Sequence, residues 1–512
     1  MPEAKKEPEF RNSFWTGFIY VNRERLGAIE KNISRIQKMI CPRIGDPDVL
    51  CKRLDGLANK ISIAEELLAE IALEAPEDLE FRTLVRDISI GNSDLTTIAV
   101  QRLLQDVIEE DCLRYEELQP YKISSQTMSC LKNVMNECSN VMYGDYASSR
   151  GPILVCWPYA EYQYLPNSRA ICFPPTESER FCFWSGLAHE GFHCKIHDFT
   201  IAKARYEDAK EEKDEARQER SHSNLQTMVS DSWKGRIDDL LSKWNTAYGT
   251  FRFNFKLMAG EAYRELYQVL FADDFYLPRE FLPHQFREIL CDVASLKIAG
   301  LSDLIFLGSQ TADLCRNTEL DLTAHFFDLA HPPDTVRFIY TLEVLTGRDL
   351  NNREITKIEP IAKDNLDYFV ENAKELVRSI LSEEKVSESW KELTEFHLIQ
   401  TYNDLIIELL PDICEIVDAL LCHADFYNQV RWSQVMQRFD EIEREKTAQK
   451  RAHALEALET SKPFDLVNLG WLKFFDLFRK TVGKSKTLKE FFTRFEAEDL
   501  YFGALWKKLS KL

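Results

Sequence analysis

The sequence lacks a hydrophobic run long enough to cross a membrane, which takes about 20 apolar residues. The closest stretch, Leu398–Cys422, is interrupted by acidic side chains, and we expect a pair of buried amphipathic helices broken at Pro411. The amino-terminal residues also lack the apolar core of a secretory signal. We therefore expect a cytoplasmic protein with no membrane insertion.

Paired cysteines and an excess of positive charge are missing as well. The 13 cysteines contain no C-x-x-C pair, so neither a disulfide framework nor a zinc ribbon is indicated. In a reducing compartment, scattered cysteines are mostly small buried hydrophobic residues. The chain has 64 Lys and Arg against 84 Asp and Glu, a net charge of −20, which disfavours nucleic acid as a partner.

Glycine and proline are scarce, with 18 of each in 512 residues, and most of the chain follows a helical period. We expect a mainly α protein with a small β-sheet. The pattern divides into a helical N-terminal domain (1–147), a central domain (148–347) and a helical C-terminal domain (348–512). Within the central domain, residues around 202–224 carry charges of both signs, which predicts a solvated helix.

The start of the central domain has a different character. Residues 151–175 are rich in β-branched and aromatic side chains, and Pro166–Ser168 is typical of a turn between two short strands. The capping box Thr176–Glu179 then predicts the start of a long helix. A small sheet therefore precedes this helix.

That helix carries the sequence His189-Glu190-Gly191-Phe192-His193. Residues at i and i+4 share one face of a helix about 6 Å apart, so both imidazoles can reach one Zn²⁺ at about 2.0–2.1 Å. Glu190 lies beside that face, where a carboxylate can take a proton from a metal-bound water. This is the motif of zinc-dependent proteases. The alternative is a pair of helix histidines that binds no metal.

A catalytic zinc usually needs a third protein ligand. His197 lies about 12 Å along the helix axis from His189, too far to share one metal. A metzincin would have a histidine where this chain has Phe199. The third ligand must therefore come from another helix.

Glu288 is the best candidate for that ligand. It shares one face of an apolar helix with Asp292, and buried acids are costly unless they meet a cation or hydrogen-bond donors. Zinc would satisfy Glu288, and a zinc-bound imidazole N–H would satisfy Asp292. The alternatives are an acid pair at the edge of a surface helix, and Glu261 as a reserve ligand.

A third segment, Ala330–Arg337, has the sequence AHPPDTVR. Together, in this order, HEGFH, E-x-x-x-D and H-P-P-x-x-x-R resemble the gluzincin peptidases related to the CaaX prenyl protease and heat-shock HtpX families, especially their soluble minigluzincin relatives. The resemblance implies a zincin-like α+β core between the two helical domains and one zinc ion per chain. It also implies roles for seven residues: His189, His193 and Glu288 as zinc ligands, Glu190 as general base, Asp292 as the acid that orients a histidine, His331 stabilising the tetrahedral intermediate, and Arg337 holding that element or a ligand.

In zincins, an extended peptide substrate pairs with the edge strand above the active-site helix. We expect this edge strand to consist of Ala170, Ile171, Cys172 and Phe173, although a buried internal strand fits the same residues. Tyr162 and Tyr164 are weaker candidates than His331 for the oxyanion. The expected function is zinc-dependent hydrolysis of a peptide or protein substrate. The alternative is a zinc-binding helical scaffold without turnover, and in either case the flanking helical domains could recruit a protein partner.

Overall fold

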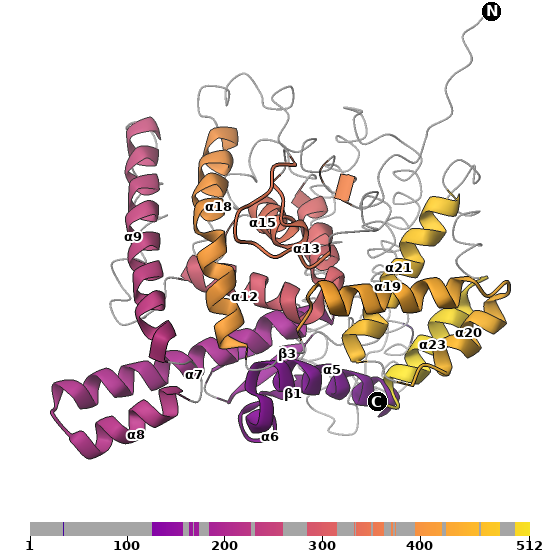
Figure 1. The fold of residues 1–512 in the computed structure, drawn as a ribbon, viewed down its shortest axis with the longest axis horizontal. Coiled ribbons are helices and arrows are strands. Elements are labelled where there is room, and N and C mark those ends of the chain that lie inside the picture. The colour runs from indigo at the N-terminus through magenta and orange to yellow at the C-terminus, as the bar shows by residue number, and fades with distance from the viewer. Residues whose placement is uncertain are drawn as a thin grey trace, which may run out of the picture.

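The computed structural model confirms a mainly helical protein with a small sheet over the residues that it describes (Figure 1). The structure describes residues 125–156, 163–173, 184–226, 231–259, 284–314, 332–362, 395–421, 426–481 and 497–512. Positions 167, 333, 350–351 and 460–461 within these ranges are not described. The isolated positions 34, 370–371 and 374 are described in addition. The predicted capping box and most of the predicted N-terminal domain lie outside the described residues. The expected domain boundaries stay predictions.

The elements are, in chain order, α5 (Ser125–Tyr143), η3 (Gly144–Tyr146), α6 (Ala147–Arg150), β1 (Ile153–Cys156), β2 (Gln163–Leu165), β3 (Ala170–Phe173), α7 (Ser185–Glu211), α8 (Glu215–Gln226), α9 (Asp231–Ala259), α12 (His284–Ala299), α13 (Leu301–Leu314), α15 (Asp334–Thr346), α18 (Glu395–Leu420), α19 (Gln429–Glu443), α20 (Ala448–Glu456), α21 (Pro463–Thr481) and α23 (Asp499–Leu509).

Helix α7 has a buried first half and a charged second half. The first half packs against α5 and α12, and its Leu187 and Phe192 are fully buried. The second half extends away from these helices, and α8 folds back beside it (Figure 1). The charged segment expected around 202–224 is therefore the end of α7 and most of α8, joined by a tight turn in which Lys213 adopts a positive φ.

The sheet has the strand order β1-β3-β2, with β1 parallel and β2 antiparallel to β3. The predicted turn between β2 and β3 is present, and within it the Arg169 N–H donates to the Pro166 carbonyl at 3.3 Å. The expectation that Ala170–Phe173 forms the edge strand is wrong. Both of its sides are paired and all of its side chains are buried, as suits an unbroken apolar run. Among the described strands, β2 is an edge strand and lies against α7.

A glycine sets the angle between α12 and α13. Gly300 has φ +68°, and its N–H donates to the Leu296 carbonyl, which ends α12 in a left-handed cap. A Cβ at this position would lie 3.1 Å from the Tyr427 ring and 3.2 Å from the Asn468 amide. The close approach of these two side chains and the positive φ both require glycine here.

A buried acid links the start of α13 to α12 and α7. Asp303 Oδ1 lies 2.6 Å from the Ser295 hydroxyl, which donates to the Ser185 carbonyl at 3.2 Å. A hydroxyl has one proton to donate, so a protonated Asp303 that donates to Ser295 completes this chain of hydrogen bonds. Consistent with that, burial raises the pKa of Asp303 to about 7.

The buried hydrophobic side chains of the described helices form one core that extends from α5 to α23. A buried ionic cluster lies within it, where Arg431 of α19 donates to Glu137 of α5 and to Asp465 of α21. Glu137 also accepts the Phe464 N–H at 2.8 Å. These contacts join segments that the sequence pattern had placed in different domains.

Helix α18 continues through Pro411, so the expected break at this residue is wrong. Proline removes one backbone hydrogen bond, but Leu410 and Ile413 on either side are fully buried, and their packing offsets that loss. None of the described helices, α18 included, is both long and apolar enough for a membrane crossing.

Candidate metal centre

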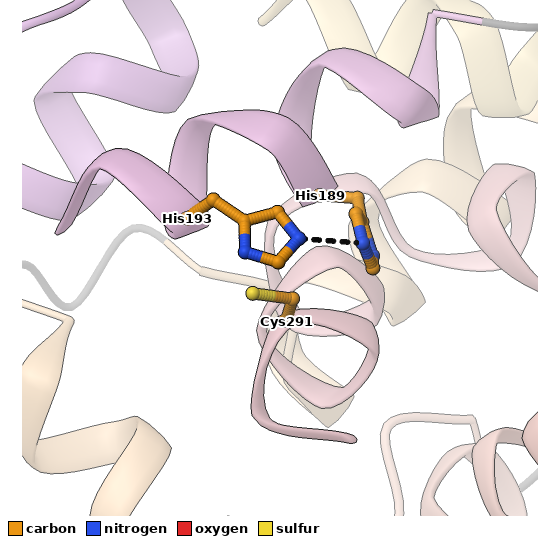
Figure 2. Close-up of side chains that lie close together, drawn as sticks. All are labelled: His189, His193 and Cys291. Carbon is orange, nitrogen blue, oxygen red and sulfur yellow. Dashed lines mark hydrogen bonds between the residues drawn. The ribbon is translucent and has the colours of Figure 1, made fainter. Parts of the chain in front are cut away.

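The centre lies where the buried half of α7 faces α12. His189 and His193 lie one turn apart on α7, and their Nε2 atoms are 3.1 Å from each other. Phe192 lies between them in sequence and is fully buried, which anchors this turn of the helix against the core. The rings meet edge to face, with centroids 4.9 Å apart, and both imidazoles point toward α12 (Figure 2).

Glu288 of α12 contacts both histidines, although it lies 99 positions after His189 in the sequence. Its Oε2 lies 3.1 Å from His189 Nε2, and its Oε1 lies 3.3 Å from His193 Nε2. The carboxylate is buried, with 4% of the residue exposed. The structure therefore brings together the three residues that the sequence predicts as metal ligands.

Asp292, one turn further along α12, contacts the other side of the His189 ring. Its Oδ1 lies 2.9 Å from His189 Nδ1. Arg337 of α15 donates to both of its oxygens, at 2.7 and 2.8 Å, and Tyr340 of the same helix donates to Oδ2. Arg337 thus fixes Asp292, and Asp292 fixes the orientation of His189.

In this arrangement, lone pairs of the two imidazoles and of the Glu288 carboxylate are directed toward one point. When Nδ1–H of a neutral His189 donates to Asp292, Nε2 carries no proton. That nitrogen faces the Glu288 carboxylate and the second imidazole, His193, at hydrogen-bonding distance. Lone pairs this close repel unless a proton or a metal ion lies among them. The donor set is therefore suited to a cation.

The pKa values of the centre indicate the same preference for positive charge. Burial lowers the pKa of His189, but the hydrogen bonds and charges of Asp292 and Glu288 outweigh this effect and raise it to about 10. Burial raises the pKa of Glu288, but the charge of His193 and the hydrogen bonds from both histidines hold it well below its usual range. The carboxylates stay ionised and attract a cation.

Cys291 is a member of the centre that the sequence pattern did not reveal. Together with His189 and His193 it forms a group that can hold a metal ion, because its Sγ and the two ring nitrogens all lie within 4.8 Å of one another (Figure 2). The thiol is fully buried, and burial raises its pKa well above the usual value. One signal for it exists in the sequence: Cys291 is three residues after Glu288 and so shares its helix face.

Glu190 directly follows His189 in the sequence, and its carboxylate is held by the sheet and not by α12. Its Oε2 accepts a hydrogen bond from the backbone N–H of Tyr164 at 2.8 Å. Tyr164 is the middle residue of the edge strand β2, so this strand and the carboxylate are in direct contact. The side chain of Tyr164 is buried and packs edge-on against the ring of His197, 6.1 Å between centroids.

Other predicted site residues are not all described. His331, Glu261 and Tyr162 lie outside the described residues, so their expected roles stay predictions. Arg337 is described, and its hydrogen bonds to Asp292 place it behind His189, with Asp292 between the two side chains. Its expected role, which is to hold the H-P-P-x-x-x-R element or a ligand, stays a prediction.

Comparisons of the chain with protein-family models, with curated proteins and with solved structures found no match. The resemblance to gluzincins therefore depends on the residues and contacts of this chain.

Proposed function

We propose that this protein is a zinc-dependent peptidase of the gluzincin type, with one zinc ion held by His189, His193 and Glu288. The observation that carries the proposal is how closely these groups approach one another: the two Nε2 atoms are 3.1 Å apart, and the Glu288 carboxylate reaches His189 Nε2 with Oε2 at 3.1 Å and His193 Nε2 with Oε1 at 3.3 Å. Ligands bound tetrahedrally to zinc at about 2.0–2.1 Å lie about 3.3–3.4 Å apart. The donor set and its spacing thus fit zinc.

The side chains around the ligands fit hydrolysis of an amide bond. When bound, zinc polarises the scissile carbonyl and lowers the pKa of a water molecule. Glu190 is the general base, which accepts a proton and passes it to the leaving amine. The Tyr164 N–H holds one oxygen of Glu190 and so fixes its orientation, leaving the second oxygen to take the proton.

Two further residues position the ligands. Asp292 accepts the Nδ1–H of His189 and keeps Nε2 free for the metal, and Arg337 neutralises the Asp292 charge. Among the other residues, His331 keeps the role that the resemblance implies, which is to stabilise negative charge on the substrate oxygen.

The substrate in this proposal is an extended peptide or a protein segment. The Tyr164 N–H is directed toward Glu190 on α7, so the free side of β2 faces the general base. A peptide that lay along this side would be next to the general base and could donate to the Tyr164 carbonyl, since the Tyr164 N–H is already bound to Glu190. The edge strand of the proposal is therefore β2, and the α7–sheet–α12 arrangement is its zincin-like core. The proposal retains a cytoplasmic location.

Glu190→Gln tests the proposed activity. Glutamine keeps the size and the acceptor for the Tyr164 N–H but cannot act as a base. We expect hydrolysis of a quenched peptide library to fall about 10²–10⁴-fold, with zinc content and circular dichroism unchanged. Glu207→Gln, at an exposed position further along α7, is the matched control and should keep wild-type activity. Wild-type cleavage by the Glu190 variant would refute the mechanism.

A second candidate function is a zinc-binding helical scaffold without turnover. The observation that favours it is Cys291, since a fourth protein ligand would close the centre and closed zinc sites are structural. Zinc measurement combined with digestion of a peptide library separates the two functions. Stoichiometric zinc without cleavage of any peptide would favour the scaffold.

A further inference from the structure

Cys291 lies three residues after Glu288 on α12, and this part of the helix is turned toward the histidines of α7. Zinc binds thiolate sulfur at about 2.3 Å and imidazole nitrogen at about 2.0–2.1 Å, so their ligand atoms lie about 3.6 Å apart on one ion. The Cys291 sulfur and the ring nitrogens of His189 and His193 lie within 4.8 Å of one another. These separations therefore need to shorten by at most about 1.2 Å for the sulfur and both nitrogens to bind one ion.

The surroundings of another buried cysteine show that this placement is specific. Cys194 follows His193 directly in sequence and is equally buried, but its sulfur accepts a hydrogen bond from the Tyr143 hydroxyl at 3.3 Å. Its side chain is thus engaged with α5, whereas that of Cys291 is close to the imidazoles (Figure 2). The two thiols offer a matched comparison within one core.

We propose that Cys291 is a fourth ligand of the metal held by His189, His193 and Glu288, and that its thiolate keeps the centre closed in the resting protein. This inference rests on the proposed zinc site and adds a regulatory step to it. In the closed state a sulfur–zinc bond has formed and the thiol proton has passed to solvent. The sulfur occupies the coordination position that hydrolysis needs open.

Opening then requires the sulfur to leave the metal and take up a proton, and Cys291 becomes an uncharged buried thiol. Cys291 is fully buried, and an uncharged cysteine packs in such a setting as a small hydrophobic residue. Three ligands, His189, His193 and Glu288, continue to hold the ion. A variant without the sulfur is open permanently.

X-ray absorption at the zinc edge of the full chain tests the assignment without depending on activity. The wild type should show a sulfur shell at about 2.3 Å in addition to the nitrogen and oxygen shell at about 2.0–2.1 Å. Cys291→Ala should lose the sulfur shell and retain zinc, and Cys291→Ser, which preserves the size of the side chain, should do the same. Cys194→Ala is the matched control and should retain the sulfur shell.

Peptide hydrolysis measures the closing effect. Cys291→Ala should cleave a quenched peptide library faster than the wild type, by about tenfold for each 1.4 kcal/mol by which the sulfur favours the closed state. Cys194→Ala should cleave at the wild-type rate.

The outcomes separate this inference from the proposed function. Zinc bound without a sulfur shell in the wild type, or with a sulfur shell that persists in Cys291→Ala, overturns the role of Cys291 and leaves the peptidase proposal intact. A sulfur shell in the wild type with no gain in hydrolysis in Cys291→Ala overturns the closing step. A wild-type protein that takes up no zinc overturns both the inference and the proposed function.

Discussion

Replacing Asp292 by asparagine probes the contact that orients a metal ligand. Asp292 accepts from His189 Nδ1, from two nitrogens of Arg337 and from the Tyr340 hydroxyl. Asparagine has nearly the same shape, but its amide nitrogen is a donor and replaces one of the two acceptor oxygens. If the amide nitrogen takes the place of Oδ1, it faces the imidazole N–H and the orientation of His189 is lost. If it takes the place of Oδ2, it faces the guanidinium, and in either orientation the ion pair with Arg337 weakens.

Two separate losses follow. A carboxylate partner of a metal-bound histidine contributes about 10–100-fold to metal affinity, which is about 1.4–2.7 kcal/mol. Removing one partner of a buried ion pair costs roughly 3–5 kcal/mol of folding free energy, and both Asp292 and Arg337 are buried, at 1% and 8% exposed. We expect Asp292→Asn to bind zinc more weakly and to unfold at lower denaturant concentration.

The matched control is Asp465→Asn. Asp465 is also buried, and it accepts hydrogen bonds from Arg431 and from Tyr427, each at 2.8 Å. It lies in the ionic cluster with Glu137, away from the metal centre. Competition with a chromophoric chelator gives zinc affinity, and urea unfolding gives stability. Both variants should lose stability, and only Asp292→Asn should lose zinc affinity. Equal zinc affinity in all three proteins would refute the role of Asp292.

Two further predictions concern stability. Burial raises the pKa of Asp303 from its usual 3.8 to about 7 in the folded protein, so the wild type loses stability as the pH rises between these two values. The gain in stability from Asp303→Asn should therefore grow by about 2 kcal/mol between about pH 5.5 and 8. A gain that is constant with pH would contradict a buried neutral acid at this position. Removal of zinc by dialysis against a chelator should lower the melting temperature, since zinc at a hundred times its Kd contributes about 2.7 kcal/mol. His193→Ala should show no such response, and an equal shift in this variant would place the metal elsewhere.

The sequence predicted the local parts of the centre because helical periodicity is local. The spacing of His189 and His193, and of Glu288 and Asp292, shows which side chains share a face of α7 and of α12. The buried position of Glu288 also follows from its apolar neighbours in the sequence. A local sequence pattern does not determine how two helices pack. The contact between the two faces therefore follows only from the chemistry of the residues on them.

The features that sequence reasoning missed depend on tertiary contacts. No cysteine pair marks Cys291 in the sequence, and its position beside the two histidines depends on how closely α12 approaches α7. The strand Ala170–Phe173 is internal because β1, from earlier in the chain, pairs with it in parallel, a non-local contact. Pro411 remains within α18 because burial on both sides of the proline outweighs one lost hydrogen bond.

We propose that His189, His193 and Glu288 together hold one zinc ion. Its most direct test is the zinc content of the purified full chain, compared with Glu288→Gln and with Glu137→Gln, which alters a buried glutamate in the ionic cluster away from the centre. We expect one zinc per chain in the wild type and in Glu137→Gln, and loss of most of the zinc in Glu288→Gln. Equal zinc in all three proteins, or none in the wild type, would contradict it.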